Sequence, residues 1–183
     1  MKKVFGFDLD GVLYPWFEAV YDYLREIKKD VKPFVEFWQD AIDNTDGLSE
    51  TFWNNMCEME ILYSKFPAKN SDVQTLQELS KDFDIVYISH RPQNIFQTTH
   101  SWLKRYGFPN PDNLCLTTLP KDLIVRKYNC YYYIEDKGKI LSSNLRNVVN
   151  LIAKRTYWNW DECETLPYVD TVDELPKLLL EIT

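Results

Sequence analysis

The sequence predicts an α/β protein in which one parallel sheet is wound by helices on both faces and carries a helical insertion after its first strand. Two observations predict this class. Short apolar runs of strand length alternate with helical stretches, and the alternation is interrupted only once. The chain has 183 residues, which is enough for one buried core plus an insertion but short of two full domains.

The apolar runs give a central sheet of five strands. Polar or turn-forming residues end each run, as is typical of buried strands. The predicted strands are Lys3 to Phe7, Phe83 to Ile88, Asn113 to Leu116, Tyr131 to Ile134 and Val148 to Ile152.

Helical stretches follow several of these strands. A parallel sheet built in this way brings the carboxyl ends of its strands to one edge, where open α/β folds bind ligands. The predicted helices are Gln93 to Tyr106, Lys121 to Lys127, Lys139 to Val148 and Val172 to Ile182.

The interruption lies between Tyr14 and about Asp82, where the periodicity is helical and no strand is predicted. We assign residues 1–13 and 71–183 to a core domain and residues 14–70 to a helical cap. The predicted helices are Phe17 to Lys28, Val35 to Ile42 and Ser49 to Tyr63 in the cap, and Ser71 to Lys81 in the core.

Composition excludes several function classes. The net charge is −7 and no basic run exceeds Lys28-Lys29, so the chain is not expected to bind a nucleic acid polymer. No apolar stretch reaches the length of a bilayer span, and Asp8 comes too early for a signal peptide, so no membrane contact is expected. A reduced, cytoplasmic protein is predicted because the cysteines are scattered without metal-ligand spacing, at Cys57, Cys115, Cys130 and Cys163.

Two carboxylates mark the end of the first strand. Asp8 and Asp10 lie two residues apart, and Gly11 then allows the backbone to turn sharply. A calcium loop would share this spacing, but it lacks a preceding apolar strand and needs further oxygen ligands, whose positions here carry apolar or aromatic side chains. The pair is therefore predicted to face a ligand at the sheet edge.

Three further features follow in order along the chain. Ser89 ends the second strand, Lys121 stands fourteen residues before Glu135, and Glu135-Asp136 ends the fourth strand. Together with the Asp-x-Asp-Gly run, they resemble the four ordered motifs of the haloacid dehalogenase superfamily. The resemblance implies that superfamily's Rossmann-like fold, with a small cap inserted after the first strand.

The resemblance also implies roles for these residues. Asp8 would be the nucleophile that forms an aspartyl phosphate, and Asp10 would protonate the leaving oxygen and then activate water. Ser89 would donate to a phosphoryl oxygen, and Lys121 would offset the negative charge. Magnesium would be held by Asp8, Asp136 and the main-chain oxygen of Asp10.

Several assignments have alternatives at this stage. Ser89 could instead cap the following helix, and Lys127 rivals the lysine six residues before it. Glu135 could bind the metal only through water. His90 and Arg91 could bind the phosphate or merely solvate their loop.

A finer resemblance is to the 5'(3')-deoxyribonucleotidase group, also called 5'-nucleotidase type C. It is carried by the place of the insertion, by Arg91-Pro92 followed by Trp102-Leu103, and by the closing segments Arg155 to Asn159 and Val172 to Leu175. It implies hydrolysis of a (deoxy)ribonucleoside monophosphate. A phosphatase of another small metabolite, or a non-catalytic phosphate-sensing or partner-binding module, would share these motifs.

The insertion is rich in aromatic side chains that could stack on a nucleobase. Trp16 and Trp53 are the candidate base-binding residues, and Asn159 is a candidate polar contact. A binding module has no use for a nucleophile together with a proton donor, so Asp8 and Asp10 favour an enzyme.

Overall fold

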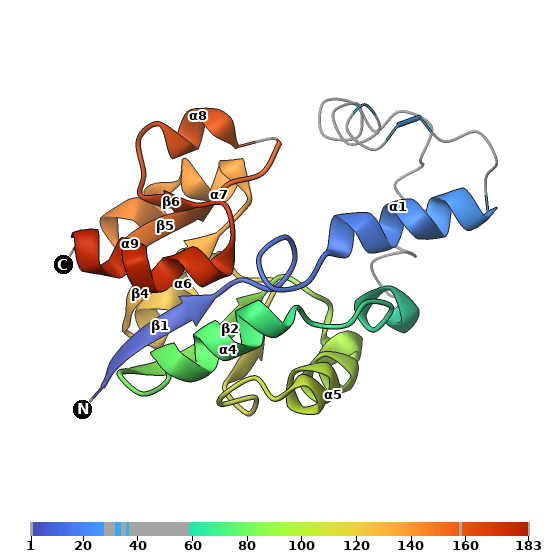
Figure 1. The fold of residues 1–183 in the computed structure, drawn as a ribbon, viewed down its shortest axis with the longest axis horizontal. Helices are drawn as coiled ribbons and strands as arrows, with labels where there is room; N and C mark the ends of the chain where they lie inside the picture. The colour runs from blue at the N-terminus through green and yellow to red at the C-terminus, as the bar shows by residue number, and fades with distance from the viewer. Residues whose placement is uncertain (1, 28–31, 34–35, 37–58, 158, 183) are drawn as a thin grey trace.

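The fold is that of an α/β protein with one parallel sheet, in agreement with the prediction (Figure 1). The computed structural model describes residues 2–27, 32–33, 36, 59–157 and 159–182. Its sheet has the strand order β3-β2-β1-β4-β5-β6. The strands are β1 (Lys3–Phe7), β2 (Phe83–Ser89), β3 (Leu114–Leu116), β4 (Cys130–Glu135), β5 (Asn150–Lys154) and β6 (Tyr168–Val169).

The sheet has six strands, where the sequence predicted five. The additional strand, β6, pairs with β5 through Ala153 and Tyr168 and through Lys154 and Val169. Two residues at a sheet edge are too short to produce an apolar run, so the count from sequence was one too low.

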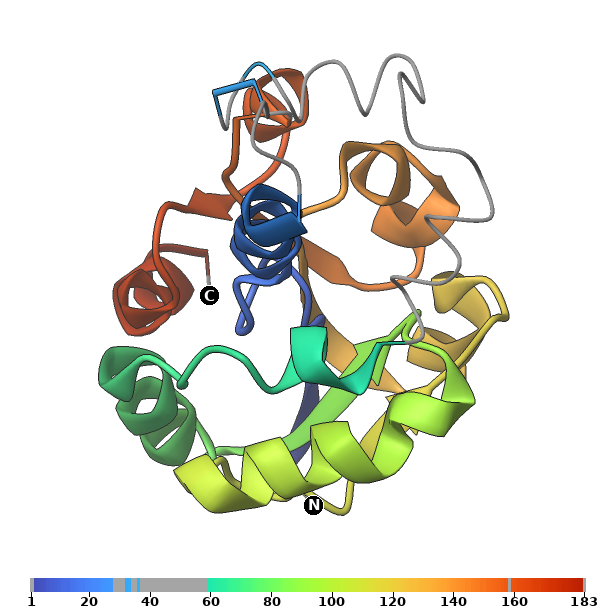
Figure 2. The same cartoon turned by 90° about the vertical axis from the view of Figure 1, so that its right-hand side faces the viewer.

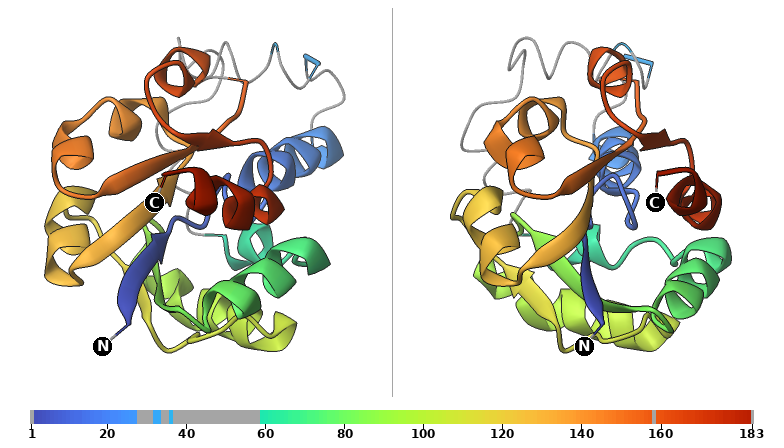
Figure 3. Two further views of the ribbon diagram at one scale, coloured as in Figure 1. Left: turned by 60° about the vertical axis from the view of Figure 1, so that its left-hand side comes forward. Right: turned by 90° about the vertical axis from the view of Figure 1, so that its left-hand side faces the viewer.

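Helices cover both faces of the sheet (Figures 2 and 3). Side chains of β2 alternate between the two layers: Ile85 and Tyr87 face one, and Val86 and Ile88 face the other. A strand that is apolar on both faces is typical of a buried parallel sheet. The first layer holds α4 (Asn70–Leu79), α5 (Phe96–Tyr106) and α9 (Leu175–Ile182), and the second holds α6 (Lys121–Lys127), α7 (Gly138–Leu141) and α8 (Trp160–Cys163).

The segment predicted as one helix over 139–148 is two short elements. Helix α7 ends where the Ser142 hydroxyl donates to the Gly138 carbonyl, at 2.9 Å. The Ser143 hydroxyl then accepts from the Leu145 N–H, at 3.2 Å, and opens a 3₁₀ turn, η3 (Asn144–Asn147). Serine hydroxyls that bond nearby backbone compete with helix continuation, which the apolar periodicity did not reveal.

Two other predicted helices begin one turn later than expected, because each opens with a 3₁₀ turn. These turns are η2 (Gln93–Ile95) before α5 and η4 (Val172–Glu174) before α9. Thr171 and Glu174 form a capping box at the second of them.

The insertion begins with α1 (Trp16–Ile27), which extends beyond the carboxyl ends of the strands (Figure 1). The described chain resumes beside α1 at η1 (Glu60–Tyr63). The helix predicted over Val35 to Ile42, except for residue 36, and most of that predicted over Ser49 to Tyr63 lie outside the described residues. The division into a core and a cap at residues 14–70 therefore stays a prediction.

Among the helices that the structure describes, none combines the length and the apolar run that a bilayer crossing needs. Cys115, Cys130 and Cys163 are free thiols, of which the last two are buried in the second layer, and Cys57 lies outside the described residues. The cytoplasmic location stays a prediction.

The contact between β1 and β4 is tightest at Gly6, and this makes a first prediction. A Cβ at Gly6 would lie 2.7 Å from Cδ2 of Tyr133, whose buried ring is fixed by a hydrogen bond from its hydroxyl to the Ile88 carbonyl. Gly6→Ala should lower the free energy of unfolding in urea by about 1–3 kcal/mol, as overpacking does. Asp84→Ala, at an exposed position of β2, should change it by less than about 0.5 kcal/mol. Equal stability of the two variants would contradict the close approach.

Candidate active site

The carboxyl ends of β1, β2 and β4 bring the predicted site residues together. Asp8 follows β1, Ser89 ends β2, and Glu135 and Asp136 end β4 and begin the next loop. They line a cavity of about 740 Å³. Three of the four motifs found in the sequence thus meet at one edge of the sheet, since parallel strands end there together.

One lysine lies at the centre of this cluster. Lys121 is the first residue of α6, and its Nζ lies 2.8 Å from Oδ1 of Asp8 and 2.6 Å from Oε2 of Glu135. Lys127, the rival from sequence, lies over the Tyr128 ring at the other end of the helix. The structure therefore places Lys121, and not Lys127, beside the nucleophile candidate.

Burial raises the free energy of ionising the carboxyl groups in this cluster. Loss of solvent, and then the charge of Glu135, raise the pKa of Asp8 to about 7, although Lys121 opposes the shift. The same two causes raise the pKa of Asp136 well above its usual range. Burial alone would lower the pKa of Lys121, but Asp8 and Glu135 hold it well above its usual range, so this lysine is charged. One ammonium therefore faces three buried carboxyl groups.

The donor set fits a divalent cation that prefers oxygen. Asp8, Glu135 and Asp136 offer carboxylate oxygens that lie within 4.8 Å of one another. Oδ2 of Asp136 is buried and has no hydrogen-bond partner among the described residues. An unsatisfied buried carboxylate oxygen beside other carboxylates is what a hard cation such as Mg²⁺ would bind.

Glu135 is the least available of the three carboxylates. Its Oε2 accepts from Lys121, and its Oε1 accepts from the Lys137 N–H at 3.1 Å. Asp136 has no such commitment on its Oδ2. The geometry therefore favours Asp136 as the direct metal ligand and gives Glu135 the role of holding Lys121.

The loop after β1 presses against the Asp136 carboxyl group. Gly11 has φ +85°, and a Cβ there would lie only 2.1 Å from Oδ2 of Asp136. The turn is closed by the Leu9 carbonyl, which accepts the N–H groups of Leu13 and Tyr14 at 2.9 and 2.8 Å. A glycine is thus required both for the backbone conformation and for the approach.

Asn159 does not have the position expected from sequence. It is fully buried, and its Nδ2 donates to the main-chain oxygens of Asp136, at 2.6 Å, and Lys154, at 2.8 Å. It does not line the cavity. Asn159 therefore fixes the loop that carries Asp136 rather than contacting a base.

Asp10 is held by Arg91, which the sequence left as either a phosphate ligand or a solvated loop residue. Nε of Arg91 lies 3.1 and 3.0 Å from the two carboxylate oxygens of Asp10, and Nη2 lies 2.6 Å from Oδ1. Burial raises the pKa of the Asp10 carboxyl group, and the Arg91 charge opposes that shift. Arg91 is buried, so it does not solvate its loop, and its charge is already paired with a carboxylate.

The two residues before Arg91 face the same cavity. The Ser89 hydroxyl lies 3.5 Å from Oδ2 of Asp10 and accepts the Arg91 N–H at 3.3 Å. It caps no helix, because the next turn starts from Pro92 without a side-chain cap. Nε2 of His90 lies 3.1 Å from the Leu119 carbonyl, and partial burial followed by the charge of Lys121 lowers the pKa of this imidazole.

Aromatic side chains also line the cavity. Trp16 and Phe17 from α1 and Tyr63 from η1 line it, so the insertion faces the acidic cluster. Trp16 thus has the position expected of a substrate contact, whereas Trp53 lies outside the described residues.

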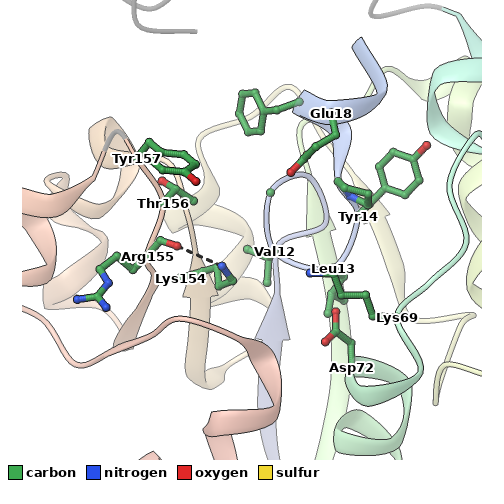
Figure 4. Close-up of a pocket in the computed structure, with 13 residues that line it drawn as sticks. Val12, Leu13, Tyr14, Glu18, Lys69, Asp72, Lys154, Arg155, Thr156 and Tyr157 are labelled. Carbon is green, nitrogen blue, oxygen red and sulfur yellow. Dashed lines mark hydrogen bonds between the residues drawn. The ribbon is translucent and has the colours of Figure 1, made fainter. Parts of the chain in front are cut away.

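A second, smaller pocket of about 160 Å³ borders the loop after Asp10 (Figure 4). Lys69, Asp72 and Lys154 border it together with residues 11–15, and Lys154 Nζ donates to the Arg155 carbonyl. It contains none of the acidic cluster, so the larger cavity is the candidate active site.

Comparisons with known proteins agree with this architecture. No family model matches the chain. A curated protein of Bacillus cereus described as "Putative nucleotidase" is 28% identical over 166 residues, which cover 85% of this chain and 87% of that protein. A haloacid dehalogenase-like hydrolase of Streptococcus pneumoniae superposes over 100% of this chain and 99% of its own, with a TM-score of 0.68 at 12% identity.

The chain has the haloacid dehalogenase fold. A second structure with this fold, a hydrolase of Deinococcus radiodurans solved with bound phosphate and sodium, covers 98% of this chain and 95% of its own at 13% identity, with a TM-score of 0.63. The fold that the resemblance of the motifs implied is confirmed, because both of these structures superpose on nearly the whole chain.

The excess negative charge leads to a prediction about stability. Because burial raises the pKa of Asp136, its ionisation costs free energy in the folded state, and the cost grows as pH rises through that pKa. Asp136→Asn should therefore raise the unfolding free energy of the metal-free protein at pH 8 by about 0.5–2 kcal/mol, and by less at pH 5. Mg²⁺ should raise the melting temperature of the unmodified protein but not that of the variant.

Asp82→Asn, at an exposed turn, is the matched control and should change neither quantity. A destabilised metal-free Asp136→Asn protein would show that this carboxylate has a partner that stabilises it without metal.

Proposed function

We propose that the protein is a magnesium-dependent phosphomonoester hydrolase that acts through an aspartyl phosphate, with a nucleoside monophosphate as its substrate. The observation that carries the proposal is the buried cluster of Asp8, Asp136 and Lys121 beside the separately held Asp10. A phosphate dianion repels a carboxylate nucleophile, so hydrolysis needs cationic charge where the two meet.

The first step is phosphoryl transfer to the protein. An oxygen of Asp8 attacks phosphorus in line, the bond from phosphorus to the leaving oxygen breaks, and Asp10 gives that oxygen a proton. Lys121 balances the charge of Asp8, and the Ser89 hydroxyl donates to a phosphoryl oxygen.

The second step frees the nucleophile. Asp10, now ionised, takes a proton from water, whose oxygen attacks the aspartyl phosphate and restores the Asp8 carboxylate. Mg²⁺ bound by Asp8, Asp136 and the Asp10 main-chain oxygen would supply positive charge to the phosphoryl oxygens in both steps.

The substrate assignment rests on the aromatic side chains that line the cavity. Trp16, Phe17 and Tyr63 give it an apolar aromatic surface, which suits a planar base. The cavity of about 740 Å³ is within the usual size of a small-molecule site. The description "Putative nucleotidase" of the Bacillus cereus relative supports the same substrate class.

The metal and the nucleophile can be tested together. Phosphate release from a nucleoside monophosphate should be abolished by a chelator, restored by Mg²⁺ and inhibited by Ca²⁺, whose looser coordination disturbs in-line geometry. Asp8→Asn should lose essentially all turnover and form no phosphoenzyme. Asp82→Asn is the control and should keep full activity. Near-normal rates in Asp8→Asn would overturn the covalent mechanism.

Substrate choice gives a separate prediction. A nucleoside 5'-monophosphate should be hydrolysed with at least about tenfold higher kcat/KM than a hexose phosphate, which is what one stacking contact of about 1–1.5 kcal/mol provides. Trp16→Ala should reduce this ratio. Trp160→Ala should not, because Trp160 lies over Arg155 outside the cavity. If the unmodified protein hydrolysed hexose phosphates with a kcat/KM equal to that for nucleotides, the nucleotide assignment would be wrong. The alternative, a phosphatase of another metabolite, would then remain.

A further inference from the structure

We propose that Arg91 is a positioning residue that orients the Asp10 carboxylate for proton transfer and does not bind the substrate phosphate. The inference deepens the proposed function and rests on it, since Asp10 needs orientation only if it moves a proton. From the sequence, Arg91 was expected either to bind the phosphate or to be a solvated loop residue. Its contacts in the structure support neither role.

The guanidinium group is committed to partners inside the protein. Nε and Nη2 face the two oxygens of Asp10, and Nη1 donates to the Thr99 hydroxyl at 3.0 Å. A planar fork that bonds one carboxylate through two nitrogens fixes the plane of that carboxylate as well as its place. Thr99 is fully buried in α5, so a residue of the protein core also fixes the position of the arginine.

Two aromatic rings complete the setting of Arg91. Its Cζ lies 5.0 Å from the centre of the Tyr14 ring and 4.6 Å from that of Tyr63. The Tyr14 hydroxyl in turn donates to the Leu62 carbonyl in η1. The orientation of Asp10 is thereby tied to the segment where the chain returns from the insertion.

These contacts leave little of Arg91 for a substrate. Only 1% of its side chain is exposed, compared with 23% of the Asp10 side chain, although both border the cavity. A phosphate that reached the guanidinium would have to displace Asp10 from it. The exposed part of the pair is the carboxylate, which is the group that must approach the leaving oxygen.

Misplacement of Asp10 has a signature that depends on the leaving group. An alkoxide leaving from a nucleotide needs a proton as its bond to phosphorus breaks, whereas nitrophenolate leaves readily without one. Loss of a phosphate ligand would instead slow both substrates and weaken the binding of phosphate itself. The two roles of Arg91 therefore predict different outcomes.

The test compares Arg91→Met, Arg91→Lys and Thr99→Val with the unmodified protein, in Mg²⁺, on a nucleoside 5'-monophosphate and on p-nitrophenyl phosphate. Arg91→Met should lower kcat/KM at least about tenfold on the nucleotide and less than about threefold on p-nitrophenyl phosphate. Arg91→Lys should recover only part of the loss, because an ammonium cannot form the planar fork.

Thr99→Val is the decisive variant, because Thr99 does not line the cavity and cannot touch substrate. We expect Thr99→Val to lower kcat/KM by less than Arg91→Met does, and again more on the nucleotide than on p-nitrophenyl phosphate. Such a loss would come only through Arg91. This variant also keeps the proposal testable if Arg91→Met fails to fold. Melting temperatures of all variants show whether a loss reflects stability.

Calorimetry with inorganic phosphate gives a readout that does not depend on turnover. Its affinity should change less than about twofold in Arg91→Met. Equal losses on both substrates, or phosphate binding weakened tenfold, would overturn the positioning role and make Arg91 a phosphate ligand. Absence of turnover by the unmodified protein on either substrate would instead overturn the proposed function.

Discussion

The site depends on one electrostatic constraint, which is that several carboxyl groups are buried at the sheet edge around a single ammonium. Asp8, Glu135 and Asp136 converge there because β1 and β4 are parallel neighbours that end together. Lys121 is buried with them and bonds two of the three. The third keeps a buried oxygen that has no hydrogen-bond partner among the described residues, and a bound cation would satisfy it.

A second cation serves a different carboxylate. Arg91 pairs with Asp10, whereas Lys121 pairs with Asp8. Arg91 lies in the loop after β2, and Lys121 begins α6, which follows β3. Asp8 and Asp10 are only two residues apart, yet they face different partners. One acid can then serve as nucleophile and the other can move protons, since their surroundings differ.

The sequence predicted those parts of the structure that follow from short-range pattern. The bounds of β1 and α6 agree with the apolar runs and the proline before Lys121. The motif residues converge as expected, because their strands were identified correctly. The partner of Arg91 was not predictable, because Arg91 lies 81 residues from Asp10 along the chain and nothing in its neighbouring sequence indicates that it is buried. Strand β6 was missed because two residues carry no periodicity.

Asn159 shows why residues near a site are hard to assign from sequence. A polar residue beside aromatic ones suggested a ligand contact, whereas the fold uses its amide to join the backbone after β4 to the end of β5. Buried loops that carry catalytic side chains still contain backbone carbonyls that need donors. A buried amide meets that need, so the position of Asp136 depends on a hydrogen bond made to its own main chain, behind the carboxylate that faces the cavity.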